Sequence, residues 1–204
     1  MSQIALPLGA GATGPARIVL GSANQAVFEA LSAAGTWPFR TAVLTGPPRA
    51  GKSLIARWFA ESGASEAIDD ADQLDETELF HRWNRAQESA TPLLLITGQH
   101  EHGWQITLPD LASRIGAALQ LELGAPDDAM LAELLQVHAE QRSLVLGPDA
   151  AAYLVPRCER SHMAVERLVA MIDRLSLERK APPTQGIWRD ALEALHGPAE
   201  PRLL

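Results

Sequence analysis

Hydrophobic positions in the first 124 residues form short runs separated by amphipathic segments. The apolar runs predict strands at 41–45, 66–69, 93–97 and 119–123, and the continuous run at 93–97 is typical of a buried parallel strand. Helical spacing of apolar residues predicts helices at 23–34, 52–62, 76–88 and 109–115 between them. Alternating helices and parallel strands favour an α/β fold built on a doubly wound sheet.

The pattern changes after Pro126, where no further strand is predicted. Asp127 is placed to cap a helix, and further helices are predicted at about 148–156, 161–180 and 185–195. The first residues are rich in Gly, Ala and Pro. We therefore expect an extended N-terminus at 1–17, an α/β domain at 18–125 and a small all-α lid domain at 126–197.

Composition and charge exclude several classes of protein. The 204-residue chain carries a formal net charge of −8 and has no dense Lys/Arg block, so sequence-specific DNA binding is not expected. No apolar run is long enough to cross a bilayer, and the N-terminus lacks a secretory pattern, so no membrane association is expected. The single cysteine, Cys158, agrees with a cytoplasmic protein.

The stretch at 46–53 has the Walker A pattern, between a predicted strand and a predicted helix. Its glycines let the backbone wrap a phosphate, its lysine can reach the β- and γ-phosphates, and its serine can hold Mg²⁺. We expect ADP or ATP with Mg²⁺ to bind here, and the predicted binding residues are Gly46, Pro47, Pro48, Arg49, Ala50, Gly51, Lys52, Ser53 and Leu54.

Three further positions complete a nucleotide-hydrolysing pattern. Asp69 ends a predicted strand and is expected to orient Mg²⁺ together with Ser53, while Asp70 is expected to orient the attacking water; a cluster of helix caps is the alternative. Gln99 follows the next strand and is expected near the γ-phosphate. Arg114 ends a short helix, where it can reach a nucleotide on an adjacent subunit; the alternative is an ordinary surface arginine.

A phosphate-loop domain followed by a helical lid resembles the AAA+ ATPases, and within them the DnaA branch and its short Hda/HdaA relatives. The residues that carry this resemblance are the Walker A stretch, 18–24, 79–84 and 108–114. The resemblance implies that Val19 and Asn24 border an adenine pocket, that Arg114 is an arginine finger and that Gln99 holds the first sensor position. Glu166 stands where the lid sensor arginine is expected, so Arg167 is the candidate for that role, with Arg160 as another.

The N-terminus is similar to the clamp-binding segment of Hda proteins. An extended chain could bond a partner through a glutamine and place apolar side chains in a pocket. The residues concerned are Gln3, Ile4, Leu6, Pro7 and Leu8. One departure from the DnaA pattern is the interval of fifteen residues (54–68) before Asp69, which is too short for an additional strand and helix, so we expect a sheet that lacks an edge strand.

The resemblance implies a regulator of replication initiation. It would bind adenine nucleotide, dock on the DNA sliding clamp and promote hydrolysis of DnaA-bound ATP through Arg114, with weak hydrolysis of its own. Three alternatives stay open, namely an autonomous ATPase of helicase-loader type, a clamp-binding adaptor with a structural nucleotide, and a small-molecule kinase, although no separate acceptor-binding segment argues for a kinase. A homo-oligomer also stays open.

Overall fold

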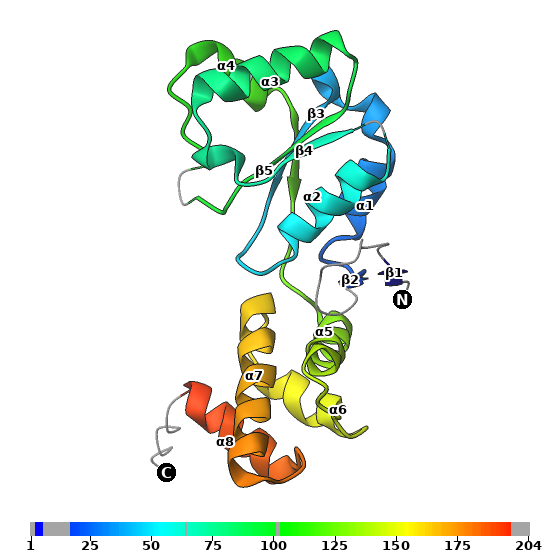
Figure 1. The fold of residues 1–204 in the computed structure, drawn as a ribbon, viewed down its shortest axis with the longest axis vertical. Coiled ribbons are helices and arrows are strands. Elements are labelled where there is room, and N and C mark those ends of the chain that lie inside the picture. The colour runs from blue at the N-terminus through cyan, green and yellow to red at the C-terminus, as the bar shows by residue number, and fades with distance from the viewer. Residues whose placement is uncertain (1–2, 6–16, 64, 101–102, 197–204) are drawn as a thin grey trace.

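A four-stranded parallel sheet forms the centre of the computed structural model, which describes residues 3–5, 17–63, 65–100 and 103–196 (Figure 1). The strand order is β4 (Glu66–Ile68), β5 (Leu93–Ile96), β3 (Thr41–Thr45) and β6 (Leu119–Glu122). In register, Leu44 pairs with Ile96 and with Leu121, and Ile68 pairs with Leu95. The α/β fold with a parallel sheet is therefore confirmed. In the described part of the chain the sheet ends at β4, without the additional edge strand, as the short 54–68 interval predicted.

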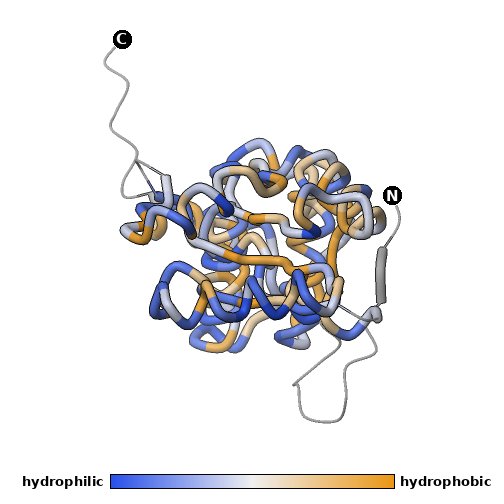
Figure 2. The backbone as a smooth tube through the Cα atoms, turned by 90° about the horizontal axis from the view of Figure 1, so that it is seen from above, coloured by the Kyte–Doolittle hydropathy of each residue, from blue (hydrophilic) through white to orange (hydrophobic). Residues whose placement is uncertain are grey.

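Helices cover both faces of this sheet. One hydrophobic core lies between the sheet and the helices α1 (Gln25–Ser32) and α2 (Lys52–Glu61). The other lies beneath α3 (Glu76–Glu88) and α4 (Pro109–Gly116). Seen from above, a hydrophobic stretch of the backbone runs through the interior, between coils of mixed hydropathy (Figure 2). Since both faces of β5 are covered, its four residues are all buried, which explains the unbroken apolar run.

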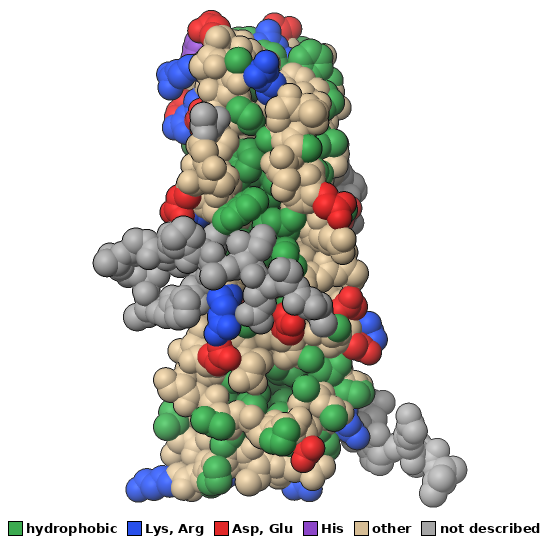
Figure 3. Space-filling model, turned by 90° about the vertical axis from the view of Figure 1, so that its right-hand side faces the viewer, with side chains coloured by type: hydrophobic (Ala, Val, Ile, Leu, Met, Phe, Trp, Pro, Cys, Tyr) green, Lys and Arg blue, Asp and Glu red, His purple; other side chains and the backbone are tan. Residues whose placement is uncertain are grey.

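The C-terminal part is entirely helical and has its own core. It consists of α5 (Asp128–Gln141), α6 (Ala150–Leu154), α7 (His162–Arg179) and α8 (Gln185–His196). Leucine, valine and isoleucine side chains of these helices pack together, and Val19 joins them from outside the helices. The two parts follow one another along the long axis of the molecule, as Figures 1 and 3 show. We call the helical part the lid.

Helix ends follow local hydrogen bonding. The side chain of Asp127 accepts a bond from the Met130 N–H at 2.8 Å and caps α5, as the sequence predicted. Asp75 caps α3, and Ser161 caps α7. Short 3₁₀ turns lie at Ala34–Thr36, Pro38–Arg40, Ala71–Gln73 and Val155–Arg157. The helix and strand bounds predicted from the sequence agree with the structure to within two residues at each end.

Two short strands stand apart from the main sheet. β1 (Gln3–Ala5) pairs antiparallel with β2 (Arg17–Val19), so that Gln3 lies opposite Val19 and Ile4 opposite Ile18. The sequence predicted an extended N-terminus but not this pairing, because the partner residues of β1 lie at least twelve positions further along the sequence. Within the described ranges, no helix combines the length and the apolar character needed to cross a membrane.

Candidate functional site

The predicted phosphate-binding groups gather at one edge of the sheet. Parallel strands all end at the same edge, and Thr45, Ile68 and Ile96 end β3, β4 and β5 there. The stretch 46–51 follows β3, the Asp69 and Asp70 pair follows β4, and Gln99 follows β5. Ligands of open α/β sheets bind outside this carboxyl edge. The sheet topology therefore brings together residues separated by some fifty positions in the sequence.

Two glycines allow the tight path of the phosphate loop. A Cβ on Gly46 would stand 2.8 Å from the Cβ of Leu123, so only glycine fits where the loop passes the end of β6. Gly51 has φ +85°, a left-handed conformation that glycine adopts without strain, and it is the N-cap residue of α2. The loop therefore opens directly onto a helix N-terminus, which favours anions.

The side chain of Lys52 folds back onto the phosphate loop that precedes it. Its Nζ donates to the carbonyl oxygens of Gly46 at 2.7 Å and Pro47 at 3.0 Å. Partial burial lowers the pKa of this ammonium, while the nearby carboxylates of Asp69, Asp70 and Asp72 act in the opposite direction. The lysine is thus held at the loop beside three acidic side chains.

The acidic side chains differ in exposure. Asp69 and Asp70 are exposed, and Asp70 has a left-handed backbone with φ +50°. The side chain of Asp72 is only 7% exposed. Its Oδ2 lies 2.9 Å from His100 Nε2, while its Oδ1 has no hydrogen-bond partner among the described residues. The hydroxyl of Ser53 and the carboxylates after β4 are oxygen donors of the type that Mg²⁺ prefers. These residues therefore fit a nucleotide-bound Mg²⁺, which would neutralise phosphate charge.

Gln99 is exposed and approaches Glu122 at the end of β6, with 3.5 Å between Nε2 and Oε1. Gln99 therefore lies at the carboxyl edge of the sheet, as predicted, and its neighbour there is the carboxylate of Glu122.

A cleft lies between the phosphate loop and the lid. Its volume is about 130 Å³, and its walls come from β2, the loop, α5 and the start of α7. Val19, Leu54 and Asn24, which the sequence predicted as nucleotide-binding residues, line this cleft. Asn24 is held there because its amide donates to the Val19 carbonyl at 2.8 Å. The sequence did not indicate the lid side of the cleft, formed by Met130, Leu134, Val137, His138, Gln141 and His162.

An ion pair joins the loop to the lid. Arg49 Nε donates to Glu166 Oε2 at 2.6 Å, and Arg49 Nη2 donates to Glu166 Oε1, so the guanidinium and the carboxylate form a two-bond fork. Hydrogen bonding and charge from Arg49 lower the pKa of Glu166. The lid residue that faces the phosphate loop is thus an acid and not an arginine.

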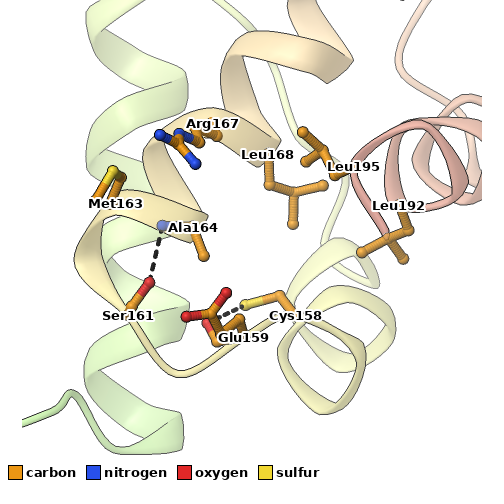
Figure 4. A pocket seen from close by; sticks show the side chains of 9 residues that line it. All are labelled: Cys158, Glu159, Ser161, Met163, Ala164, Arg167, Leu168, Leu192 and Leu195. Carbon is orange, nitrogen blue, oxygen red and sulfur yellow. Dashed lines mark hydrogen bonds between the residues drawn. The ribbon is translucent and has the colours of Figure 1, made fainter. Parts of the chain in front are cut away.

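The structure does not bring Arg167 to the phosphate loop. This arginine is exposed and lines a second cavity of about 150 Å³ between α7 and α8 (Figure 4). One residue along a helix is a rotation of about 100°, so Glu166 and Arg167 face different sides of α7. Arg160 bonds Asp128 at 2.7 Å instead. Neither of the predicted lid arginines therefore lies at the cleft.

Arg114 is held in an aromatic cage on α3. Its guanidinium carbon lies 4.3 Å from the ring centre of Trp83 and 4.5 Å from that of Phe80, and Nη1 donates to Asn84 Oδ1 at 2.6 Å. α4 leads into the start of β6, so Arg114 lies toward the edge of the sheet opposite the phosphate loop, with α4 remote from the lid (Figure 1). Arg114 is not among the residues that line the cleft.

The predicted N-terminal docking segment is only partly described. Gln3 and Ile4 lie in β1, while Leu6, Pro7 and Leu8 lie outside the described residues. The two described positions are extended, but they are paired with β2.

Solved structures with a similar fold include AAA+ proteins. Domain III of the replication initiation protein DnaA from Thermotoga maritima matches with a TM-score of 0.71 and 14% identity, over 89% of this chain and 95% of that chain. The Holliday junction branch migration motor RuvB from Thermotoga maritima matches with a TM-score of 0.60 and 20% identity, over 85% of this chain and 68% of that chain. AMPPCP-bound DnaA from Aquifex aeolicus matches with a TM-score of 0.60 and 16% identity, over 80% and 66%.

No family model matches the chain. At the identities of these matches the likeness concerns the fold. The parallel sheet, its flanking helices and the helical C-terminal part together form the fold shared by the AAA+ domains of DnaA and RuvB.

Proposed function

We propose that the chain binds an adenine nucleotide, ADP or ATP, with Mg²⁺ in the cleft between the phosphate loop and the lid. The proposal is supported by the left-handed Gly51, the position of Lys52 and the apolar cleft beside them. Residues of the loop would hold the phosphates, and Val19 and Asn24 would border the base. Ser53 and Asp69 would hold Mg²⁺, with Asp70 and Gln99 near the γ-phosphate.

Nucleotide binding is tested with a fluorescent ADP analogue and Mg²⁺. The intact chain should bind it, and Lys52→Ala should weaken binding at least tenfold, because the ammonium is the loop's phosphate contact. Lys180→Ala, which removes the chain's other lysine at the end of α7, is the matched control and should leave affinity unchanged. Equal affinity in wild type and Lys52→Ala would contradict this site.

We further propose that the chain is a DnaA-related regulator that docks on the sliding clamp and promotes hydrolysis of ATP bound to DnaA. The observation that carries this is the position of Arg114. It lies at the sheet edge opposite its own phosphate loop, so a nucleotide that its guanidinium contacted would have to be bound to another molecule. The stacking on Trp83 and Phe80 pre-orders a long side chain, which reduces the entropy lost when it docks.

Clamp docking is assigned to Gln3–Leu8 by its resemblance to a clamp-binding segment. Gln3 and Ile4 are already extended in β1, the conformation in which a peptide would add to a partner. Because their backbone pairs with β2, docking would require this short pairing to be released or to remain compatible with the partner.

The regulator proposal is tested by measuring ATP turnover by DnaA with DNA-loaded clamp. Turnover should rise on adding the chain and should be lost with Arg114→Ala, while Arg57→Ala, an exposed arginine of α2, should behave as wild type. A melting measurement on Arg114→Ala separates lost activity from lost folding.

The outcomes also distinguish the alternatives. Turnover by the chain alone, abolished in Lys52→Ala, would indicate an autonomous ATPase. Loss of clamp capture in Gln3→Ala with normal behaviour of Arg114→Ala would indicate an adaptor. Unchanged DnaA turnover with every form of the chain would refute the regulator.

A further inference from the structure

Arg49 stands in a position of the phosphate loop where its backbone is strained. Its φ is +66°, in the left-handed region that residues other than glycine seldom adopt and that costs about 1–2 kcal/mol. Nothing in phosphate binding by backbone N–H groups requires a side chain there, since glycine would adopt the same conformation without strain. An arginine at a strained position where glycine would fit suggests that its side chain has a function.

That side chain reaches the lid. Arg49 and Glu166 form the two-bond fork described above, between positions 117 residues apart in the sequence. The side chain of Glu166 is only 25% exposed, whereas that of Arg49 is 62% exposed. The carboxylate is therefore set into the lid surface, and the arginine extends to it from the loop.

The same guanidinium adjoins the cleft. Arg49 lines it together with Ala50 and Gly51, whose backbone belongs to the phosphate loop. A phosphate group accepts the same bidentate fork as a carboxylate and carries more charge. A polyphosphate in the loop and Glu166 would therefore compete for one guanidinium.

Resting on the proposed nucleotide binding, we propose that the Arg49–Glu166 pair is a latch between loop and lid that nucleotide phosphate opens. In the absence of phosphate the pair holds the lid to the loop. When a di- or triphosphate binds, Arg49 turns from the Glu166 carboxylate to the phosphate, and the lid is released from the loop. Arg49, a loop residue, thus provides the phosphate-binding guanidinium, because no lid arginine among the described residues lies at the cleft. It also couples phosphate binding to release of the lid.

The latch is tested by a double-mutant cycle on affinity for a fluorescent ADP analogue with Mg²⁺. Glu166→Gln should bind about 3- to 10-fold more tightly than wild type, because it removes the competitor of the phosphate. Arg49→Gly, which relieves the backbone strain and so should remain folded, should bind more weakly than Glu166→Gln. In the Arg49→Gly background, Glu166→Gln should have no further effect.

A matched control is Glu178→Gln, which removes the acid of an exposed lid pair, Arg174–Glu178, on the same helix. It should bind as wild type does. If Glu166→Gln tightens binding equally with and without Arg49, the carboxylate acts on phosphate directly and the latch is refuted. Wild-type affinity in Glu166→Gln refutes it as well.

Lid release has a separate readout in small-angle X-ray scattering. ADP with Mg²⁺ should change the radius of gyration of the wild type, and the unliganded Arg49→Gly protein should already resemble the liganded state. A wild type that binds nucleotide without any such change overturns the latch but leaves nucleotide binding intact. A wild type that binds no nucleotide overturns both.

Discussion

The phosphate loop passes close to Leu123 at the end of β6, so we predict that Gly46→Ala destabilises the protein. The new Cβ would stand 2.8 Å from the Cβ of Leu123 and 3.4 Å from its Cγ and Cδ1. Leu123 is 2% exposed, and its Cβ is fixed to the backbone, so a change of rotamer cannot relieve the contact. The backbone at the start of the loop must therefore move.

The cost follows from this contact. Overpacking of a filled site costs about 1–3 kcal/mol. Replacing glycine by alanine restricts the unfolded chain and returns about 0.4–1 kcal/mol. The expected net loss is about 1–2 kcal/mol, which for a chain of this size lowers Tm by roughly 2–8 °C.

The assay is thermal unfolding followed by circular dichroism, with Gly35→Ala as control. A Cβ on Gly35 meets nothing within 4 Å, and Gly35 does not have a positive φ, so its Tm should stay equal or rise slightly. Because Lys52 bonds the Gly46 carbonyl, Gly46→Ala should also weaken binding of ADP. A Tm for Gly46→Ala at or above that of Gly35→Ala would refute the close approach.

Three further predictions concern stability. Asp127→Ala should lower Tm by about 2–4 °C through loss of about 1 kcal/mol of helix capping at Met130, whereas Asp127→Asn, also a good cap, should not. Burial lowers the pKa values of His138 and His162 below 6.5, so near that pH the unfolded chain binds more protons than the folded chain. The unfolding free energy should therefore decrease as pH falls through 6.5. Replacing both histidines by glutamine should reduce this dependence of the unfolding free energy on pH, measured by urea titrations. Trp188→Phe should change the unfolding free energy by less than about 1 kcal/mol, because the buried indole N–H has no hydrogen-bond partner among the residues that the structure describes.

Local patterns along the chain were enough to predict the strands of the main sheet, the helices and the fold class, but not β2 or the short 3₁₀ turns. The apolar run of β5 predicts a strand buried on both faces, and the Asp127 cap predicts the start of α5, because both depend on neighbouring residues. The Walker A stretch predicts its own loop and the helix after it. The short interval before Asp69 predicts that the sheet lacks the additional edge strand that the resemblance to DnaA implies, and the described part of the chain has none there.

Side-chain partners were decided by the tertiary structure. The rotation of α7 directs Glu166, and not Arg167, to the loop, and the packing of α4 on α3 places Arg114 between Phe80 and Trp83. The lid wall of the cleft, with His138 and His162, is likewise invisible in the sequence. Such contacts join positions dozens of residues apart, so they depend on how helices dock and rotate against one another, which no periodicity of a single segment encodes.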